Sequence, residues 1–109
     1  MFIYYIDGEK FISDDVHIPW LEISSPNENT PAYEDLTTGY KEWCEKGWKF
    51  HRLIGPAHIR SDGSKFFFLN GKKYKNVKEW IKDHPNPDLY FDAIGVLTET
   101  DKILWFLQN

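Results

Sequence analysis

Metal binding and acid–base catalysis require histidine, cysteine or carboxylate side chains at suitable spacing, and this chain offers few of them. The four histidines form no His-x-x-x-His pair, and none stands at a zinc-ligand spacing from the single cysteine. A structural zinc site needs four ligands at close spacing, usually including cysteine pairs. The sequence therefore predicts neither a metal site nor a cofactor among His17, His51, His58, His84 and Cys44.

The sequence also offers no support for a catalytic nucleophile or for a phosphate-binding loop. A catalytic cysteine needs a neighbouring histidine and an activated thiolate, whereas Cys44 follows Trp43 in a predicted strand and is more simply a small residue of a sheet. The carboxylate pairs Asp14-Asp15 and Glu34-Asp35 are typical of caps and solvated turns. A phosphate-binding loop has the spacing G-x-x-x-x-G-K. The chain instead has three evenly spaced glycines, Gly55, Gly63 and Gly71. We therefore expect no enzyme activity.

One constellation combines positive charge with aromatic surface. If the strands alternate, His58 and Arg60 share one face and Lys49 and His51 share another. Two arginines could then fork onto a phosphate or carboxylate, with a tryptophan as a stacking plane. The alternative is that the aromatic residues form the core and the bases only decorate its outer face. The candidate ligand-binding residues are Trp48, Lys49, His51, Arg52, His58, Arg60, Lys65, Lys72 and Lys73.

The charge is strongly segmented along the chain. The net charge is −4, but residues 1–35 carry −7, residues 41–82 carry +7 and residues 83–109 carry −4. One interpretation is that the acidic ends fold back on the basic middle or that the charges solvate the surface. The other is a basic face for an anion, such as a nucleotide, a nucleic acid or an acidic protein.

The candidate ligand-binding residues lie in or near a short sequence motif that occurs twice and must position them. Residues 41–50 align with residues 65–74, 24 positions later, with Gly47 on Gly71, and residues 4–11 form a looser copy. Aromatic residues before a glycine turn predict a strand, a turn and a second strand. Asp7-Gly8 and Asn70-Gly71 are typical of type I′ hairpin turns. The same turn type is expected at Asp62-Gly63 and, more weakly, at Lys46-Gly47.

These phrases resemble the short MORN-type (MORN-2-like) repeats of bacterial and bacteriophage proteins, most of which have no assigned function. The resemblance covers about residues 30–75, with residues 1–11 as a degenerate copy, and implies a β-hairpin scaffold. The residues that carry it are Gly55-Pro56-Ala57, Asp62-Gly63, Lys41-Glu42-Trp43, Asn70-Gly71-Lys72 and His51-Arg52.

The pattern changes after Tyr74. Residues 76–79 form a capping box, and residues 77, 80 and 81 are apolar at helical spacing. Residues 88–94 predict a second short helix. Residues 98–101 form another capping box before an apolar face of Ile103, Leu104, Phe106 and Leu107, which predicts a third helix. A hairpin of residues 96–98 against 103–107 is the alternative.

The predicted fold is α+β, a meander of short antiparallel strands built from degenerate 24-residue hairpin repeats, with short C-terminal helices packed on it. We expect one domain over residues 1–109. Its parts are an N-terminal hairpin and connector (1–23), a loop (24–31), the hairpin repeats (32–75) and a C-terminal helical segment (76–109).

The chain is expected to reside in the cytoplasm of a bacterium or an infected host. No stretch approaches the ~20 apolar residues of a membrane span. Residues 1–4 lack a basic lead and a cleavage site, so we expect no signal peptide. A single cysteine excludes an internal disulfide and fits a reducing compartment.

The expected function is non-enzymatic binding of a protein partner, with a host-interaction or counter-defence role in a phage or bacterial setting. The alternative is a nucleotide- or oligonucleotide-binding protein that uses the basic and aromatic residues for an anionic ligand. A second alternative is a structural or assembly protein whose sheet edges pair between copies in a homo-oligomer.

Overall fold

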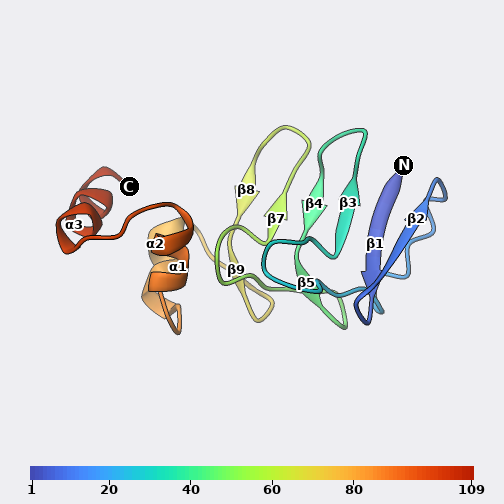
Figure 1. Cartoon of the computed structure of the whole chain (residues 1–109), viewed down its shortest axis with the longest axis horizontal. Coiled ribbons are helices and arrows are strands. Elements are labelled where there is room, and N and C mark those ends of the chain that lie inside the picture. Colours follow the sequence, from blue (N-terminus) through green and yellow to red (C-terminus); the bar gives the residue numbers. More distant parts are fainter.

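A computed structural model describes the whole chain, residues 1–109, and shows an α+β fold. Six strands form one antiparallel sheet in the order β2-β1-β3-β4-β7-β8, and three short helices follow near the C-terminus (Figure 1). The meander of short antiparallel strands expected from the sequence is thus confirmed. The strands of this sheet are β1 (Phe2–Ile6), β2 (Glu9–Ser13), β3 (Tyr33–Asp35), β4 (Lys41–Glu42), β7 (His58–Ile59) and β8 (Lys65–Phe66).

Two small hairpins extend the central strands beyond a break. The chain leaves β4 at Trp43 and enters β5 (Cys44–Glu45), which pairs with β6 (Lys49–Phe50). It leaves β8 at Phe67 and enters β9 (Phe68–Leu69), which pairs with β10 (Lys72–Lys73). The two halves pair alike: Tyr33 lies opposite Glu42 in β3 and β4, and His58 lies opposite Phe66 in β7 and β8.

The two strongest turn predictions are confirmed by the backbone angles. Asp7 and Gly8 have φ values of 51° and 82°, and Asn70 and Gly71 have 49° and 84°, so both central residues adopt the left-handed region that a type I′ turn needs. Each turn closes a two-residue loop, between Ile6 and Glu9 and between Leu69 and Lys72.

The other two turn predictions are wrong. Lys46 and Gly47 belong to a three-residue loop in which Gly47 and Trp48 have positive φ, 86° and 56°. Around Asp62, only Gly63 has positive φ, and the loop is closed by the Arg60 amide, which donates to the Ser64 carbonyl at 2.9 Å. The Asp62 carboxylate accepts a hydrogen bond from the Ser64 amide at 2.9 Å. That local bond stabilises a longer turn, in which Asp62 keeps an ordinary backbone conformation.

The C-terminal segment forms three helices, which settles the helix-or-hairpin alternative. Asn76 caps α1 (Val77–Asp83) by accepting from the Glu79 amide at 3.0 Å, and Thr98 caps α3 (Glu99–Gln108) by accepting from the Asp101 amide at 3.1 Å. Between them lies α2 (Asp88–Ala93). Both capping residues leave the helical region and supply an acceptor for an otherwise unpaired amide.

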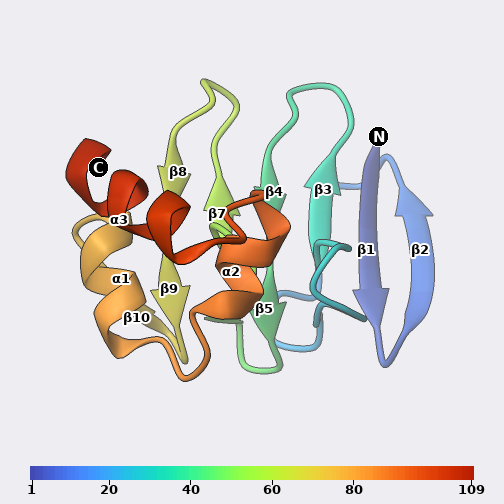
Figure 2. The same cartoon turned by 60° about the vertical axis from the view of Figure 1, so that its left-hand side comes forward.

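The helices lie beyond one end of the sheet: α1 and α2 stand side by side next to it, and α3 lies farther out (Figures 1 and 2). The Trp80 indole of α1 donates to the Phe68 carbonyl of β9 at 3.2 Å. Phe91 of α2 packs edge-on against Trp105 of α3, with ring centroids 5.1 Å apart. The apolar face expected on α3 is mostly exposed, because the buried side chain of this helix is Trp105. None of the helices has the length and apolar character that a membrane span requires.

Buried side chains gather in three neighbouring clusters along a molecule with extents of 47 × 25 × 22 Å. One cluster lies under the first strands and includes Ile23 and Tyr33. A small central cluster surrounds Trp43 and Ala57. The third joins Leu69 to the buried side chains of the helices: Trp80, Ile81, Phe91 and Trp105.

Candidate functional site

The structure does not bring the nine candidate residues together in one patch. Two of them, Lys65 and Lys73, line a groove between the sheet and α1, and Arg60 lies beside it. His51 and Arg52 lie at a small polar pocket, and Trp48 and His58 lie next to the buried carboxylate of Glu42. The remaining lysines, Lys49 and Lys72, form ion pairs on the surface.

The first of these places, the basic groove, has a volume of about 530 Å³. It starts at β8, the outer strand of the sheet, and continues along the segment that leads from β10 into α1. Four of its eight lining residues are aromatic or aliphatic, and three are lysines. The lining residues are Lys65, Phe66, Phe67, Lys73, Tyr74, Lys75, Asn76 and Val77.

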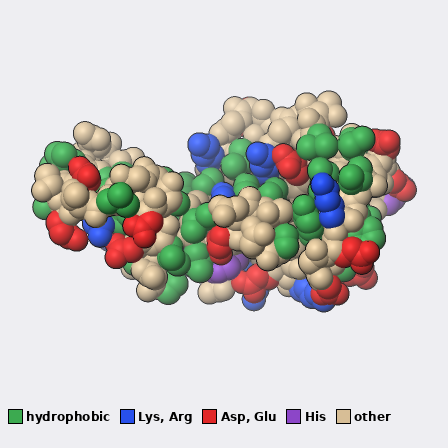
Figure 3. Space-filling view, in the orientation of Figure 1, with side chains coloured by type: hydrophobic (Ala, Val, Ile, Leu, Met, Phe, Trp, Pro, Cys, Tyr) green, Lys and Arg blue, Asp and Glu red, His purple; other side chains and the backbone are tan.

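The cations of the basic groove have no acidic partner. The Arg60 guanidinium lies 4.7 Å from the centre of the Phe66 ring, and the Lys73 ammonium lies 4.5 Å from the same centre. No carboxylate lies within 4.0 Å of Arg60, Lys65, Lys73 or Lys75. Figure 3 shows Lys and Arg side chains on the part of the sheet next to the helical end, and acidic side chains on that end itself. The groove is therefore an attractive site for an anionic partner.

Lys49 and Lys72 are already neutralised. The Lys72 ammonium lies 3.5 Å from the Asp83 carboxylate and 4.9 Å from the centre of the Tyr74 ring. The Lys49 ammonium lies 3.8 Å from the carboxylate of Glu45, four residues earlier. Both predicted site residues thus help to hold hairpins in place, at most by a few tenths of a kcal/mol for exposed pairs of this kind.

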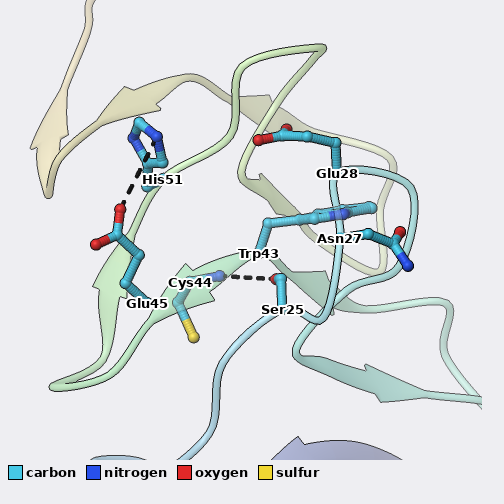
Figure 4. A pocket seen from close by; sticks show the side chains of 7 residues that line it. All are labelled: Ser25, Asn27, Glu28, Trp43, Cys44, Glu45 and His51. Atoms are coloured by element: carbon cyan, nitrogen blue, oxygen red, sulfur yellow. Dashed lines mark hydrogen bonds and ion pairs between the residues drawn. The ribbon is translucent and has the colours of Figure 1, made fainter. Parts of the chain in front are cut away.

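A second place, the polar pocket, has a volume of about 180 Å³ and lies beneath the loop 24–31 (Figure 4). His51 Nδ1 accepts a hydrogen bond from the Asn70 amide at 2.9 Å, so in the neutral ring Nε2 carries the proton and faces Glu45 at 3.9 Å. The Glu28 carboxylate accepts from the Leu53 amide at 2.8 Å. The pocket is lined by Ser25, Asn27, Glu28, Trp43, Cys44, Glu45 and His51.

Arg52 lies behind this pocket as a structural side chain. Its guanidinium stacks 3.7 Å from the centre of the Trp43 ring. It also donates to the carbonyls of Glu28 at 2.9 Å and Pro56 at 3.1 Å. Burial lowers the pKa of Arg52, and the charge of Glu28 opposes that shift. The bond from Nε holds the loop 24–31 and the bond from Nη1 holds Pro56, so these two donors are not free to bind a phosphate.

The third place surrounds Glu42, which the sequence did not single out. Glu42 is only 1% exposed, and its carboxylate accepts hydrogen bonds from the Tyr40 hydroxyl and from the Trp48 indole, the latter at 2.8 Å. Burial raises the pKa of Glu42, and both hydrogen bonds oppose the rise. The one local signal was the i, i+2 spacing of Tyr40 and Glu42; in the sheet, Glu42 lies between Tyr33 and His58 of the neighbouring strands.

His58 stands beside Glu42 in the same row of the sheet. Its ring stacks on Phe50 with centroids 5.5 Å apart and lies at the same distance from Phe66. Its Nε2 is buried and has no hydrogen-bond partner. Burial lowers the pKa of His58, and the charges of Arg60 and Lys73 lower it further. The imidazole is consequently neutral at pH 7 and serves as an aromatic core residue.

The single cysteine lies inside the protein and is not activated by its surroundings. The Cys44 thiol is buried, and burial together with the charges of Glu42 and Glu45 raises its pKa to about 12, so the reactive thiolate is suppressed. No group of three histidine, cysteine or carboxylate side chains converges as metal ligands do. The features that could recognise a ligand are the cations and the apolar lining residues of the basic groove.

Comparison of the chain with family models, with curated proteins and with solved structures finds no match in any of the three. The function therefore has to be inferred from the chemistry of the site.

Proposed function

We propose that this protein is a non-enzymatic binding protein whose basic groove holds an acidic segment of a protein partner. The observation that carries the proposal is the combination of apolar lining residues with cations that have no carboxylate within 4.0 Å. An acidic segment with apolar side chains would neutralise Lys65, Lys73 and Lys75 and cover the apolar lining residues Phe67 and Val77. Interfaces combine an apolar centre with charged borders in this way.

The second candidate function is binding of a nucleotide or oligonucleotide in the same groove. Its support is that phosphates are recognised by the same cations. Base recognition also needs free aromatic faces. Arg60 and Lys73 already lie against the ring of Phe66, and Trp48 packs on Trp20 with centroids 5.2 Å apart. These contacts favour a carboxylate-bearing peptide over a stacked base.

Fluorescence anisotropy separates the two candidates. The probes are a labelled peptide of Glu-Glu-Leu repeats, its Gln-Gln-Leu counterpart and labelled oligodeoxythymidine. We expect binding of the acidic peptide alone, with at least a tenfold loss of affinity in Lys73→Glu/Lys75→Glu. A control of equal charge change toward the opposite edge of the sheet, Lys10→Glu/Lys46→Glu, should retain most of the affinity. Preference for oligodeoxythymidine, or equal effects of both double variants, would contradict the proposal.

The proposed biological setting rests on the resemblance to MORN-type repeats alone. That resemblance supports a bacterial or phage protein of the cytoplasm that contacts a host protein, for instance in counter-defence. An assembly role through sheet edges has one structural support, since β2 and β8 are the outer strands of the six-stranded sheet. Affinity capture from a bacterial lysate, with the groove variant as the control, tests the first role. A capture pattern that is the same for both proteins would count against it.

A further inference from the structure

α3 carries an apolar stripe that the rest of the chain leaves uncovered. Thr100, Ile103, Leu104 and Leu107 follow the i, i+3, i+4, i+7 spacing of one helix face. Ile103 is 61% exposed, Leu104 47% and Leu107 77%, whereas Trp105 on the opposite side is 8% exposed. A helix with apolar residues on both sides is typical of a helix that is buried on both sides.

Acidic side chains border this stripe. At 100° per residue, Glu99 and Asp101 of the first turn fall on either side of it. The single base of α3, Lys102, is occupied by Asp88 at 2.8 Å and by Glu99 at 3.4 Å. Asp92 and Asp101 have no basic side chain within 4.0 Å. The exposed face of α3 is therefore apolar in the centre, with the unpaired carboxylate of Asp101 on one border and Glu99, which shares Lys102 with Asp88, on the other.

The basic groove has the complementary character, because its lining combines apolar side chains with lysines that have no acidic partner. The two surfaces do not meet within one chain. α3 lies beyond α2, at the end of the molecule farthest from the sheet (Figure 1), and its stripe is exposed. The acidic C-terminal end thus does not fold back to neutralise the basic groove of its own chain.

We propose that the stripe of α3 docks in the basic groove of a second copy, and that two copies exchange this contact reciprocally about a twofold axis. This inference rests on the proposed function and names the acidic segment. Stable interfaces bury about 800 Å² on each partner, more than one short helix face provides. The reciprocal arrangement forms the contact twice, and closes the assembly as a dimer.

Charge exchange tests the inference in solution. Sedimentation equilibrium of the full chain over a concentration series should show a mass rising from 13.0 kDa to twice that value. Added salt should weaken the association, because its borders are charged. Groove variant Lys65→Glu/Lys73→Glu/Lys75→Glu and helix variant Glu99→Lys/Asp101→Lys should each be monomeric. Circular dichroism and thermal unfolding verify that both variants are folded.

Sedimentation of an equimolar mixture of the groove variant and the helix variant is the decisive experiment. In the mixed pair one contact has both charges reversed and the other has both charges native, so a heterodimer should form where neither variant alone associates. A wild-type protein that stays monomeric at all concentrations would overturn the inference. A dimer that survives in both variants, or a mixture that stays monomeric, would also overturn it.

The peptide assay of the proposed function separates the two failures. A monomeric wild type that still binds the Glu-Glu-Leu peptide in the groove would leave the proposed function intact and remove only the second copy as the partner. A monomeric wild type that binds no acidic peptide would remove both. For the apolar part of the contact, Leu107→Gln should weaken the dimer at least tenfold, and Ile12→Gln on β2, which is 59% exposed, should not.

Discussion

The indole of Trp48 donates a hydrogen bond to the buried carboxylate of Glu42 at 2.8 Å. Trp48 sits in the β5–β6 loop with a φ of 56°, a conformation that bulky residues rarely adopt. The bond ties this loop to the middle of the sheet, where the Tyr40 hydroxyl also donates to Glu42. A hydrogen bond between the β5–β6 loop and the central strand β4 thus fixes how the β5–β6 hairpin packs against the sheet.

Replacing Trp48 by Phe keeps a ring and removes the donor. We expect Trp48→Phe to lower the free energy of unfolding by about 2 kcal/mol, because a buried carboxylate loses a hydrogen-bond donor. Urea unfolding followed by circular dichroism measures the change. Trp20→Phe is the matched control, since Trp20 packs against Trp48 but its indole forms no hydrogen bond with Glu42. Equal losses in the two variants would show that the hydrogen bond contributes little.

Glu42 should make stability depend on pH. Its native pKa is raised above the unfolded value of 4.5, so the folded chain binds this proton more tightly than the unfolded chain does. The stability that this proton provides is present below pH 4.5 and is lost as pH rises through the native pKa. Glu42→Gln should remove that decline, because the amide oxygen still accepts from Trp48 and the amide group donates to Tyr40. Unfolding curves between pH 4 and pH 8 test this, and an unchanged pH profile would contradict it.

His58 should act in the opposite direction. Its native pKa is lowered from 6.5, so protonation favours the unfolded chain, and stability is lost as pH falls from 6.5 toward the native pKa. His58→Phe should be more stable than the wild type by about 1 kcal/mol, because a buried nitrogen without a partner is replaced by carbon. The gain should be larger at pH 5 than at pH 8. A loss of stability at both pH values would mean that His58 Nε2 has a partner in solution.

Gly71 is subject to two constraints, a positive φ and a close neighbouring side chain, whereas Gly8 is subject only to the first. Both have a φ above 80° in a type I′ turn, but a Cβ on Gly71 would meet Lys49 Cγ at 2.9 Å, whereas a Cβ on Gly8 would meet no atom within 4 Å. We expect Gly8→Ala to cost about 1 kcal/mol through backbone strain alone. Gly71→Ala should cost more, since the Lys49 side chain must also shift. Thermal unfolding of the two variants compares them directly, and equal costs would show that the Lys49 side chain moves aside freely.

Local features of this fold could be predicted from the sequence, and contacts between distant segments could not. Asn70-Gly71 specifies its turn because two adjacent residues tolerate positive φ. The capping residues Asn76 and Thr98 likewise act within three residues of themselves. By contrast, Arg52 binds the Glu28 carbonyl across 24 residues of chain, and nothing near Arg52 signals that contact.

The same distinction explains why the nine candidate residues do not form one site. Lys65 and Lys73 were expected to belong to one patch with Trp48 and Arg52, on the basis of strand alternation. Alternation assigns residues to faces within a continuous strand, but the breaks at Trp43 and Phe67 redirect the strands that follow. The part of the patch that persists, the basic groove, depends on the segment that links β10 to α1.

The measurement that tests the basic groove most directly is a titration of the ¹⁵N-labelled protein with the Glu-Glu-Leu peptide, followed by amide chemical shifts. The largest shift changes are expected in β8, in β10 and in the linking segment up to Val77. Saturation should follow one binding curve for all of them. Changes confined to the polar pocket around His51 and Glu28, or no saturable change at all, would contradict the assignment of the groove as the binding site.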